Sequence, residues 1–158
     1  MPNRLGRFVV LALISLHLIG CSSTAIASLL PVPSGPLLTV TTRGGLCVDG
    51  PCGSTIVIER DGRIHQVAPQ AADLGTLPAG LLGSLEAAVK TTSFDAMRAR
   101  KFTGECPTAY DGQEVIYEFG TPTGTERIAS CETEIDPNQP VFAAVRAALQ
   151  TVTAEPAS

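Results

Sequence analysis

The segment that most constrains this chain is an apolar run from Phe8 to Ile19, which follows two arginines, Arg4 and Arg7. A run of about a dozen apolar residues is too short for a helix that must cross the roughly 30 Å apolar interior of a bilayer. It is a normal length for the core of a secretory signal peptide, which also begins with positive charge. We therefore predict that the chain is exported and that its fold forms from the residues after this leader.

The leader, residues 1–20, ends beside a cysteine in the sequence Leu18-Ile19-Gly20-Cys21. These four residues resemble the lipobox of bacterial lipoproteins. The resemblance implies cleavage before Cys21, a lipidated thioether at Cys21 and attachment to a bacterial membrane, either the cell membrane or the outer membrane. Each buried methylene of an acyl chain such as palmitate contributes about 0.8 kcal/mol, and more than one chain gives stable anchoring.

Two other fates of the leader stay open at this point. Ala25-Ile26-Ala27 fits the A-x-A pattern of an ordinary secretory cleavage site, which would release the chain without a lipid. The leader could also remain uncleaved as an anchor. Cysteine parity excludes only an uncleaved and unlipidated Cys21, because the chain has five cysteines and one thiol would then be left over.

Four cysteines remain for the folded part, and an exported chain can join them as disulfides. Of the three possible pairings we favour Cys47–Cys52, which closes a short turn-rich loop, with Cys106–Cys131, which joins the two ends of a predicted hairpin region. A zinc site is the alternative. The 24 residues between Cys106 and Cys131 fit no common zinc pattern, so we expect no bound metal.

The length of the mature chain predicts one domain. Removal of residues 1–20 leaves 138 residues, which is enough for a single core. Residues 21–36 contain three prolines and lack helical or strand periodicity, which predicts a lipidated N-terminus and a flexible tether. The domain is expected over 37–152, followed by a disordered tail over 153–158.

The mature chain is acidic. Arg4 and Arg7 leave with the leader, so nine basic residues remain against fifteen acidic residues, a net charge near −6. Nucleic-acid binding needs a cationic face that displaces counterions, so we exclude nucleic acid as a partner. The same charge disfavours electrostatic adhesion to anionic lipid. The lipid on Cys21 is therefore the expected membrane contact, and a protein in the envelope or outside the cell is the expected partner.

The first half of the domain predicts strands followed by a helix. Residues 37–42 alternate and are β-branched, which indicates a strand. A hairpin is predicted over 55–67 around Asp61-Gly62, and a two-residue turn there would pair Ile58 with His65. Thr76-Leu77-Pro78 predicts a helix start with a threonine cap. The buried stripe of this helix would be Leu81, Leu85, Ala88 and Val89.

The second half predicts a hairpin followed by a helix. The hairpin is expected over 114–131, with Val115, Tyr117 and Phe119 on one face and with Glu118 opposite Arg127 as a cross-strand ion pair. A last helix is expected to begin within 136–140 and to bury Val141, Val145, Leu149 and Val152. The predicted class is α+β: a small antiparallel sheet of about four to five strands with two helices on one face, stapled by disulfides.

No pattern in the sequence identifies a reaction. His65 is the single histidine after the leader, and G-x-S-x-G, H-E-x-x-H and phosphate-binding glycine loops are absent. We therefore expect no catalytic residues, no cofactor and no enzymatic activity. Glu132, Glu134 and Asp136 alternate, so in an extended segment they would share one side. They would either hold a hard cation through carboxylate oxygens or form a solvated strand end before a helix.

A local resemblance indicates a binding function. The chain is similar to the second half of the secreted subtilisin-inhibitor family at Cys106-Pro107-Thr108-Ala109-Tyr110-Asp111, at Cys131-Glu132 and at Val141-Phe142-Ala143. The resemblance implies a loop over 105–111 that meets a serine protease through Pro107, Thr108, Ala109 and Tyr110. Thr108-Ala109 would be the scissile-like bond, braced by a Cys106–Cys131 disulfide. The C-x(3–4)-C loop before an Asp-Gly hairpin is instead similar to uncharacterised exported bacterial domains.

We therefore expect a membrane-anchored, non-enzymatic binding module. A serine-protease inhibitor that presents the Cys106–Asp111 loop is the alternative, and an undetected hydrolase is the second alternative. A protruding loop at Thr108 would favour the inhibitor. A large apolar patch would favour the binding module, and a deep pocket with convergent polar groups would favour the hydrolase.

Overall fold

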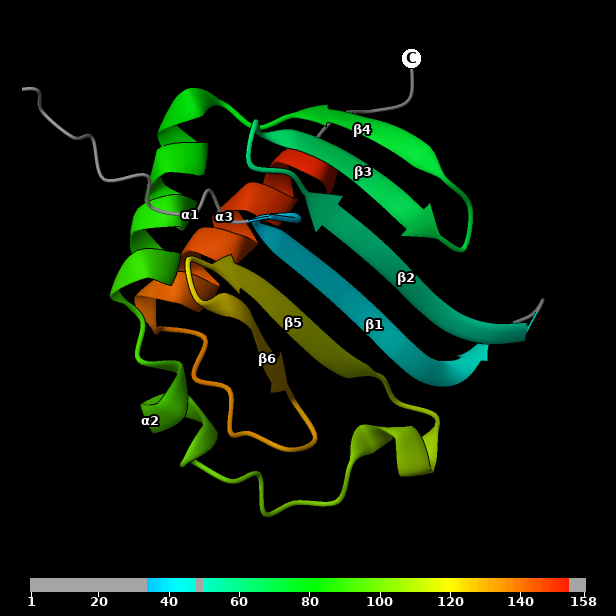
Figure 1. Ribbon diagram of the computed structural model, residues 1–158. Helices are drawn as coiled ribbons and strands as arrows, with labels where there is room; N and C mark the ends of the chain where they lie inside the picture. The colour runs from blue at the N-terminus through cyan, green and yellow to red at the C-terminus, as the bar shows by residue number, and fades with distance from the viewer. Residues whose placement is uncertain (1–33, 48–49, 154–158) are drawn as a thin grey trace, which may run out of the picture. The chain divides into compact units, whose positions relative to one another are not determined.

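The computed structural model describes residues 34–47 and 50–153, which form one antiparallel sheet with helices on one of its faces (Figure 1). The strands are β1 (Leu38–Cys47), β2 (Gly50–Ile58), β3 (Arg63–Ala68), β4 (Ala72–Thr76), β5 (Glu114–Thr121) and β6 (Gly124–Ala129). The helices are α1 (Ala79–Thr91), α2 (Phe94–Arg98) and α3 (Pro140–Thr153), with a 3₁₀ helix, η1 (Pro107–Tyr110). The α+β class is confirmed, but these residues form six strands rather than four to five, and three α-helices rather than two.

The strand order is β4-β3-β2-β1-β5-β6, so β1 lies in the middle of the sheet. Alternation along β1 assigns its side chains to two faces. Leu38 and Val40 pair with Phe119 and Tyr117 of β5 on the face that α1 and α3 cover, behind the sheet in Figure 1. Neighbouring β1 residues such as Thr39 belong to the opposite face, which these helices leave uncovered.

The core lies between this sheet face and the helices. Phe119, Leu38 and Ile58 are fully buried there. The predicted helix stripes are confirmed: Leu85, Ala88 and Val89 of α1 and Val141 and Val145 of α3 are buried, while Leu81, Leu149 and Val152 are partly buried against the core. Burial of one such side chain contributes about 1.5–3 kcal/mol, so this shared core holds the helices on the sheet.

The first hairpin differs from the prediction by one residue. Ile64, not His65, pairs with Ile58, and His65 pairs with Val57. The turn holds three residues, Arg60 to Gly62, because the Glu59 amide donates to the Arg63 carbonyl and Gly62 adopts φ +88°. A three-residue loop that ends in a left-handed glycine is the next most common hairpin after the two-residue type. The register therefore places Ile64, rather than His65, in the core.

The predicted threonine cap of the first helix is wrong. Thr76 ends β4, an edge strand that the sequence did not indicate, and α1 begins after Pro78 without a side-chain cap. The additional helix is α2, at whose start the Ser93 hydroxyl accepts from the Ala96 amide.

The second hairpin has the predicted register. Glu118 lies opposite Arg127, and Thr121 pairs with Gly124 across the turn. Arg127 nevertheless donates to both carboxylate oxygens of Glu132 at 2.9 Å, so its ion pair is with Glu132 rather than with Glu118. Glu132, which follows β6, therefore takes the place of Glu118 as the partner of Arg127.

The chain divides into two units, Met1–Leu30 and Pro31–Ser158. The leader and Cys21 lie outside the described residues. Among the helices that the structure describes, none has both the length and the apolar character needed to cross a membrane. The core described above lies entirely in the second unit.

Candidate functional site

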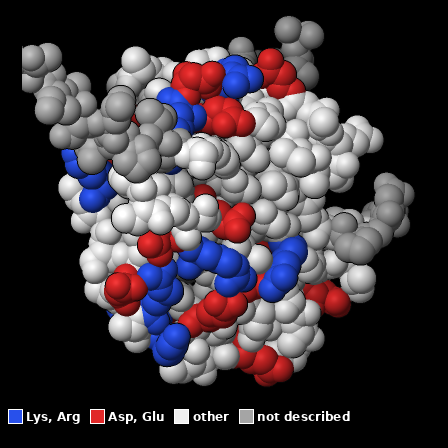
Figure 2. All heavy atoms as spheres, viewed as in Figure 1, with Lys and Arg blue, Asp and Glu red and all other residues white. Residues whose placement is uncertain are grey.

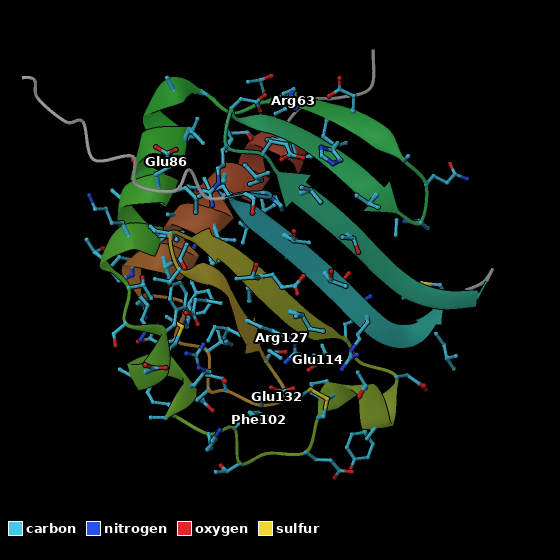
Figure 3. All side chains as sticks on the ribbon, in the orientation of Figure 1. Arg63, Glu86, Phe102, Glu114, Arg127 and Glu132 are labelled. Carbon is cyan, nitrogen blue, oxygen red and sulfur yellow. A yellow bond between two sulfur atoms is a disulfide. The ribbon has the colours of Figure 1, made fainter. Side chains whose placement is uncertain are left out.

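Both disulfides lie at the end of the sheet where β1 ends and β5 begins. Cys47–Cys52 ties the β1–β2 turn, with Cα atoms 5.2 Å apart. Cys106–Cys131 ties the residue before η1 to a residue just after β6, with Cα atoms 5.1 Å apart. Both predicted pairings are therefore confirmed. We call residues 44–47 and 105–114, together with these two disulfides, the braced end (Figures 1 and 3).

η1 packs against two glycines of β1, at which the pairing of β1 with β2 is interrupted. Gly44 and Gly45 adopt φ +89° and +80°, a region that L-residues rarely occupy. A Cβ on Gly44 would lie 2.6 Å from Cγ2 of Thr108, and a Cβ on Gly45 would lie 3.1 Å from the Asp111 carbonyl oxygen. The two glycines therefore let η1 pack closely against β1.

The Thr108–Ala109 segment is exposed, as the inhibitor alternative requires, but it is not extended. The Ala109 amide donates to the Cys106 carbonyl at 2.9 Å, and the Gly112 amide donates to the Pro107 carbonyl at 2.8 Å. These bonds close a 3₁₀ turn that ends at Asp111 in a left-handed conformation, φ 59°. The loop that the resemblance implies over 105–111 is therefore a compact turn, which Pro107 begins and the Cys106–Cys131 disulfide braces.

Two large apolar side chains of the braced end face solvent. Leu46 is 77% exposed and Tyr110 is 69% exposed. The Tyr110 hydroxyl donates to a carboxylate oxygen of Glu105, and this hydrogen bond raises the pKa of Tyr110. The tyrosine ring is thereby held on the surface by a partner from its own loop.

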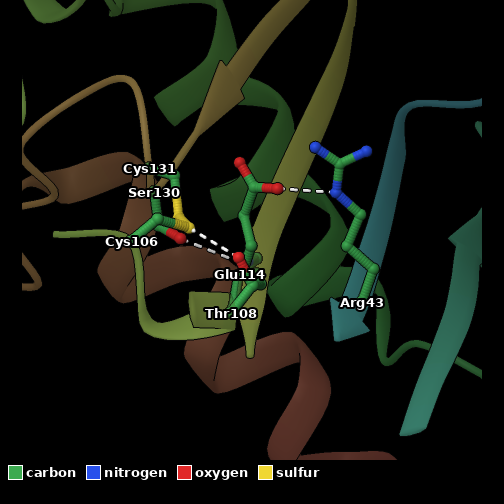
Figure 4. Close-up of a disulfide and its surroundings, with 7 residues drawn as sticks. Arg43, Cys106, Thr108, Glu114, Ser130 and Cys131 are labelled. Carbon is green, nitrogen blue, oxygen red and sulfur yellow. Dashed lines mark hydrogen bonds and ion pairs between the residues drawn. A yellow bond between two sulfur atoms is a disulfide. The ribbon is translucent and has the colours of Figure 1, made fainter. Parts of the chain in front are cut away.

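An ion pair between β1 and β5 lies at the braced end. Arg43 Nε donates to Glu114 Oε2 at 2.6 Å across β1 and β5 (Figure 4). The Glu114 side chain is only 4% exposed, whereas that of Arg43 is 61% exposed. A buried carboxylate needs such a partner, because its desolvation is otherwise uncompensated. The pair lines a surface hollow of about 440 Å³ together with Thr108 and the Cys106–Cys131 disulfide.

Charges of both signs gather near this hollow. Arg127 and Glu132 lie beside Glu114 in Figure 3, and Figure 2 shows acidic and basic side chains intermingled in the lower half of the same face. Among the described residues, no three acidic, histidine or cysteine side chains form a group that could hold a metal ion. Glu132 is bound by Arg127, and Asp136 lies 4.0 Å from Arg100, so both have cationic neighbours.

His65 lies elsewhere, on β3, two strands away from β1. Its Nε2 is 3.8 Å from Glu59 Oε1 on the uncovered side of the sheet, and its side chain is partly exposed. The structure therefore does not bring His65 to the braced end.

Sequence reasoning missed three contributors to the site: Leu46, the Arg43–Glu114 pair, and the contact of Gly44 with Thr108. The adjacent glycines Gly44 and Gly45 were a usable signal, because glycine within a strand often marks a bulge or a close backbone approach. The burial of Glu114 had no signal in the sequence.

Comparisons with known proteins give no family assignment. No protein-family description matches the sequence, and no curated protein matches it. The two disulfides indicate an oxidising, extracytoplasmic environment.

Proposed function

We propose that this protein is a membrane-anchored, extracytoplasmic binding module without enzymatic activity, and that its protein partner docks on the braced end. The observation that carries the proposal is the position of Leu46 and Tyr110, two exposed apolar side chains on segments that two disulfides tie. Tyrosine is enriched among the residues that dominate binding energy at protein interfaces.

The rigidity of the braced end supports this role. Ordering a mobile loop on binding reduces affinity, and a loop that is already fixed avoids most of that cost. Here the turn hydrogen bonds of η1, its packing on Gly44 and the Cys106–Cys131 disulfide fix the backbone before any partner arrives. A partner would therefore meet a preformed surface.

The direction of β1 supports the same role for an anchored protein. The proposed tether precedes β1, whereas Cys47 is the last residue of β1 and belongs to the braced end. The regularly paired part of β1, Leu38–Arg43, spans about 17 Å at roughly 3.3 Å per residue. Along the chain, the proposed tether therefore joins the domain before β1, and the braced end includes the opposite end of that strand.

Protease inhibition is the second candidate function. The exposure of Thr108 and Ala109 and the Cys106–Cys131 disulfide favour it. An inhibitor segment that adds a strand in a protease cleft needs free backbone amides, and η1 would have to open to supply them. Titration of residues 22–158 against elastase-like and broad-specificity extracellular serine proteases tests this role. Slow-dissociating inhibition that Thr108→Pro abolishes would support it, and full protease activity would exclude it.

The experiment that separates a docking surface from a merely stable loop is site-directed crosslinking on intact cells. A photoreactive residue in place of Ala109 lies within the braced end, beside Tyr110. One in place of Val67, which is 52% exposed on β3, provides a matched control on another exposed part of the domain. A partner that is captured only from position 109 supports the proposal.

A further inference from the structure

A second hollow lies where α3 meets β5 and the segment that leads into α3. It has a volume of about 380 Å³, in the size range of small-molecule sites, roughly 300–1,000 Å³. Its walls include Tyr117, Ile135, Phe142 and Leu149. Tyr117, Ile135 and Leu149 are only partly buried against the core, so the hollow is an apolar surface that the described residues leave open.

One cation lines this apolar hollow. Arg146 is the single charged residue of α3, and its side chain is exposed. Within residues 34–47 and 50–153, no acidic side chain forms an ion pair with Arg146, although Arg43, Arg63, Arg98, Arg100 and Arg127 each have one. An exposed guanidinium without an acidic partner, beside an apolar wall, favours a ligand that has an apolar part and its own negative charge.

Tyr117 adds a hydrogen-bond donor to the same hollow. Its ring packs on Phe142 with a centroid distance of 5.1 Å. Burial raises the pKa of Tyr117, so the hydroxyl keeps its proton at neutral pH. In the part of the chain that the structure describes, this hydroxyl makes no hydrogen bond, and it can donate to a ligand oxygen.

We propose that this hollow binds a free fatty acid, with the acyl chain against the Tyr117, Phe142 and Leu149 wall and the carboxylate on Arg146. A single guanidinium matches the single charge of a carboxylate and can bind both of its oxygens. The hollow is small, so it accommodates one acyl chain and not the two of a phospholipid. This site is separate from the braced end and does not depend on the function proposed for it.

Calorimetric titration of residues 22–158 with dodecanoate, below its micelle concentration, tests the proposal. Pro31–Ser158 is one compact unit that contains the whole described core, so this part of the chain is expected to fold without the leader. We expect one dodecanoate per chain and much weaker binding of dodecanol, which has the same chain without the charge. Arg146→Gln should weaken dodecanoate binding about tenfold or more, and Arg146→Lys should restore part of it. Lys90→Gln, on exposed α1 surface, is the matched control and should leave binding unchanged.

A second readout separates the proposed site from general adhesion. Dodecanoate should shift the ring resonances of Tyr117 and leave those of Tyr110, at the braced end, unchanged. Absence of binding, equal binding of dodecanol, or binding that Arg146→Gln leaves intact would each overturn the proposal. Binding to residues 34–158 but not to 22–158 would also overturn it, because the N-terminal segment of the chain would then be the natural occupant.

Discussion

Gly44 of β1 and Thr108 of η1 touch so closely that a Cβ on Gly44 would come within 2.6 Å of the threonine methyl group. Gly44 also adopts φ +89°, so backbone conformation and close approach both require glycine there. This contact joins the two halves of the braced end, which come from segments more than sixty positions apart in the sequence.

We expect Gly44→Ala to destabilise the domain by about 1–3 kcal/mol, through overpacking against Thr108 and a strained backbone. Gly75→Ala is the matched control, because Gly75 adopts φ +94° with nothing within 4 Å of an added Cβ. Urea unfolding of both variants measures the difference. An equal loss of stability in both would show that the contact with Thr108 contributes nothing beyond the backbone term.

The stability of the domain should depend on the ion pair between Arg43 and the buried carboxylate of Glu114. Replacement of Arg43 by methionine leaves that carboxylate without its hydrogen-bond donor, so we expect a loss of about 1–3 kcal/mol. Arg63→Met should have little effect, because the Arg63–Asp61 pair is exposed on both sides. Equal losses in the two variants, measured by chemical unfolding, would mean that the Arg43–Glu114 pair is no more than a surface ion pair.

The two disulfides should differ in their contribution to stability. Each should stabilise the domain by about 2–4 kcal/mol if unstrained, and closure of a longer loop removes more entropy from the unfolded chain. The double variant Cys106→Ser/Cys131→Ser, which opens a separation of 25 residues, should therefore lose more than Cys47→Ser/Cys52→Ser, which opens a separation of 5. Thermal unfolding of the two variants ranks them, and the reverse order would contradict the loop-length argument.

The two tyrosines of the chain should both ionise above the ordinary pKa of tyrosine, for different reasons. Hydrogen bonding to Glu105 raises the pKa of Tyr110, and burial raises that of Tyr117, both from an ordinary value of 10.0. Glu105→Ala should return only Tyr110 towards that value in a tyrosinate absorbance titration. The folded state holds these protons after the unfolded state has lost them, so the free energy of unfolding should be unaffected below pH 10 and fall above it. If Glu105→Ala left the titration of Tyr110 unchanged, the hydrogen bond to Glu105 would not be the cause of its raised pKa.

The lipid anchor is testable apart from the fold. Cys21→Ala should release the protein from membranes or leave it as an unprocessed precursor, since the lipobox resemblance makes Cys21 the acylated residue. Detergent partitioning and intact-mass measurement of the wild-type chain provide the comparison. A wild-type mass that starts at Ser28 without lipid would refute the anchor and support ordinary secretion.

Periodicity and cysteine arithmetic predicted much of this fold. The alternation in β5, the apolar stripes of α1 and α3, and both disulfide pairings are readable because each depends on residues close together in sequence or on a small set of cysteines. β4 was not readable, because Ala72–Thr76 has little β-branched alternation and pairs mainly through backbone contact with the edge of β3. The three-residue turn was also ambiguous, since Asp-Gly serves both hairpin types.

The candidate site was less readable than the fold. The sequence singled out Pro107 to Tyr110 as a loop, but it did not indicate that this loop is a 3₁₀ turn packed on Gly44 of β1. Leu46 and Arg43 become significant only when the end of β1 is placed beside the start of β5. Such contacts between distant segments are not encoded in local periodicity.

The central claim, that the braced end is the docking surface, is tested most directly by photocrosslinking on intact cells from position 109, with position 67 as control. The account predicts one specific protein captured from position 109 and none from position 67, with capture reduced by Tyr110→Ala because its exposed ring is removed. The same yield from both positions, or capture from position 109 that Tyr110→Ala leaves unchanged, would contradict it.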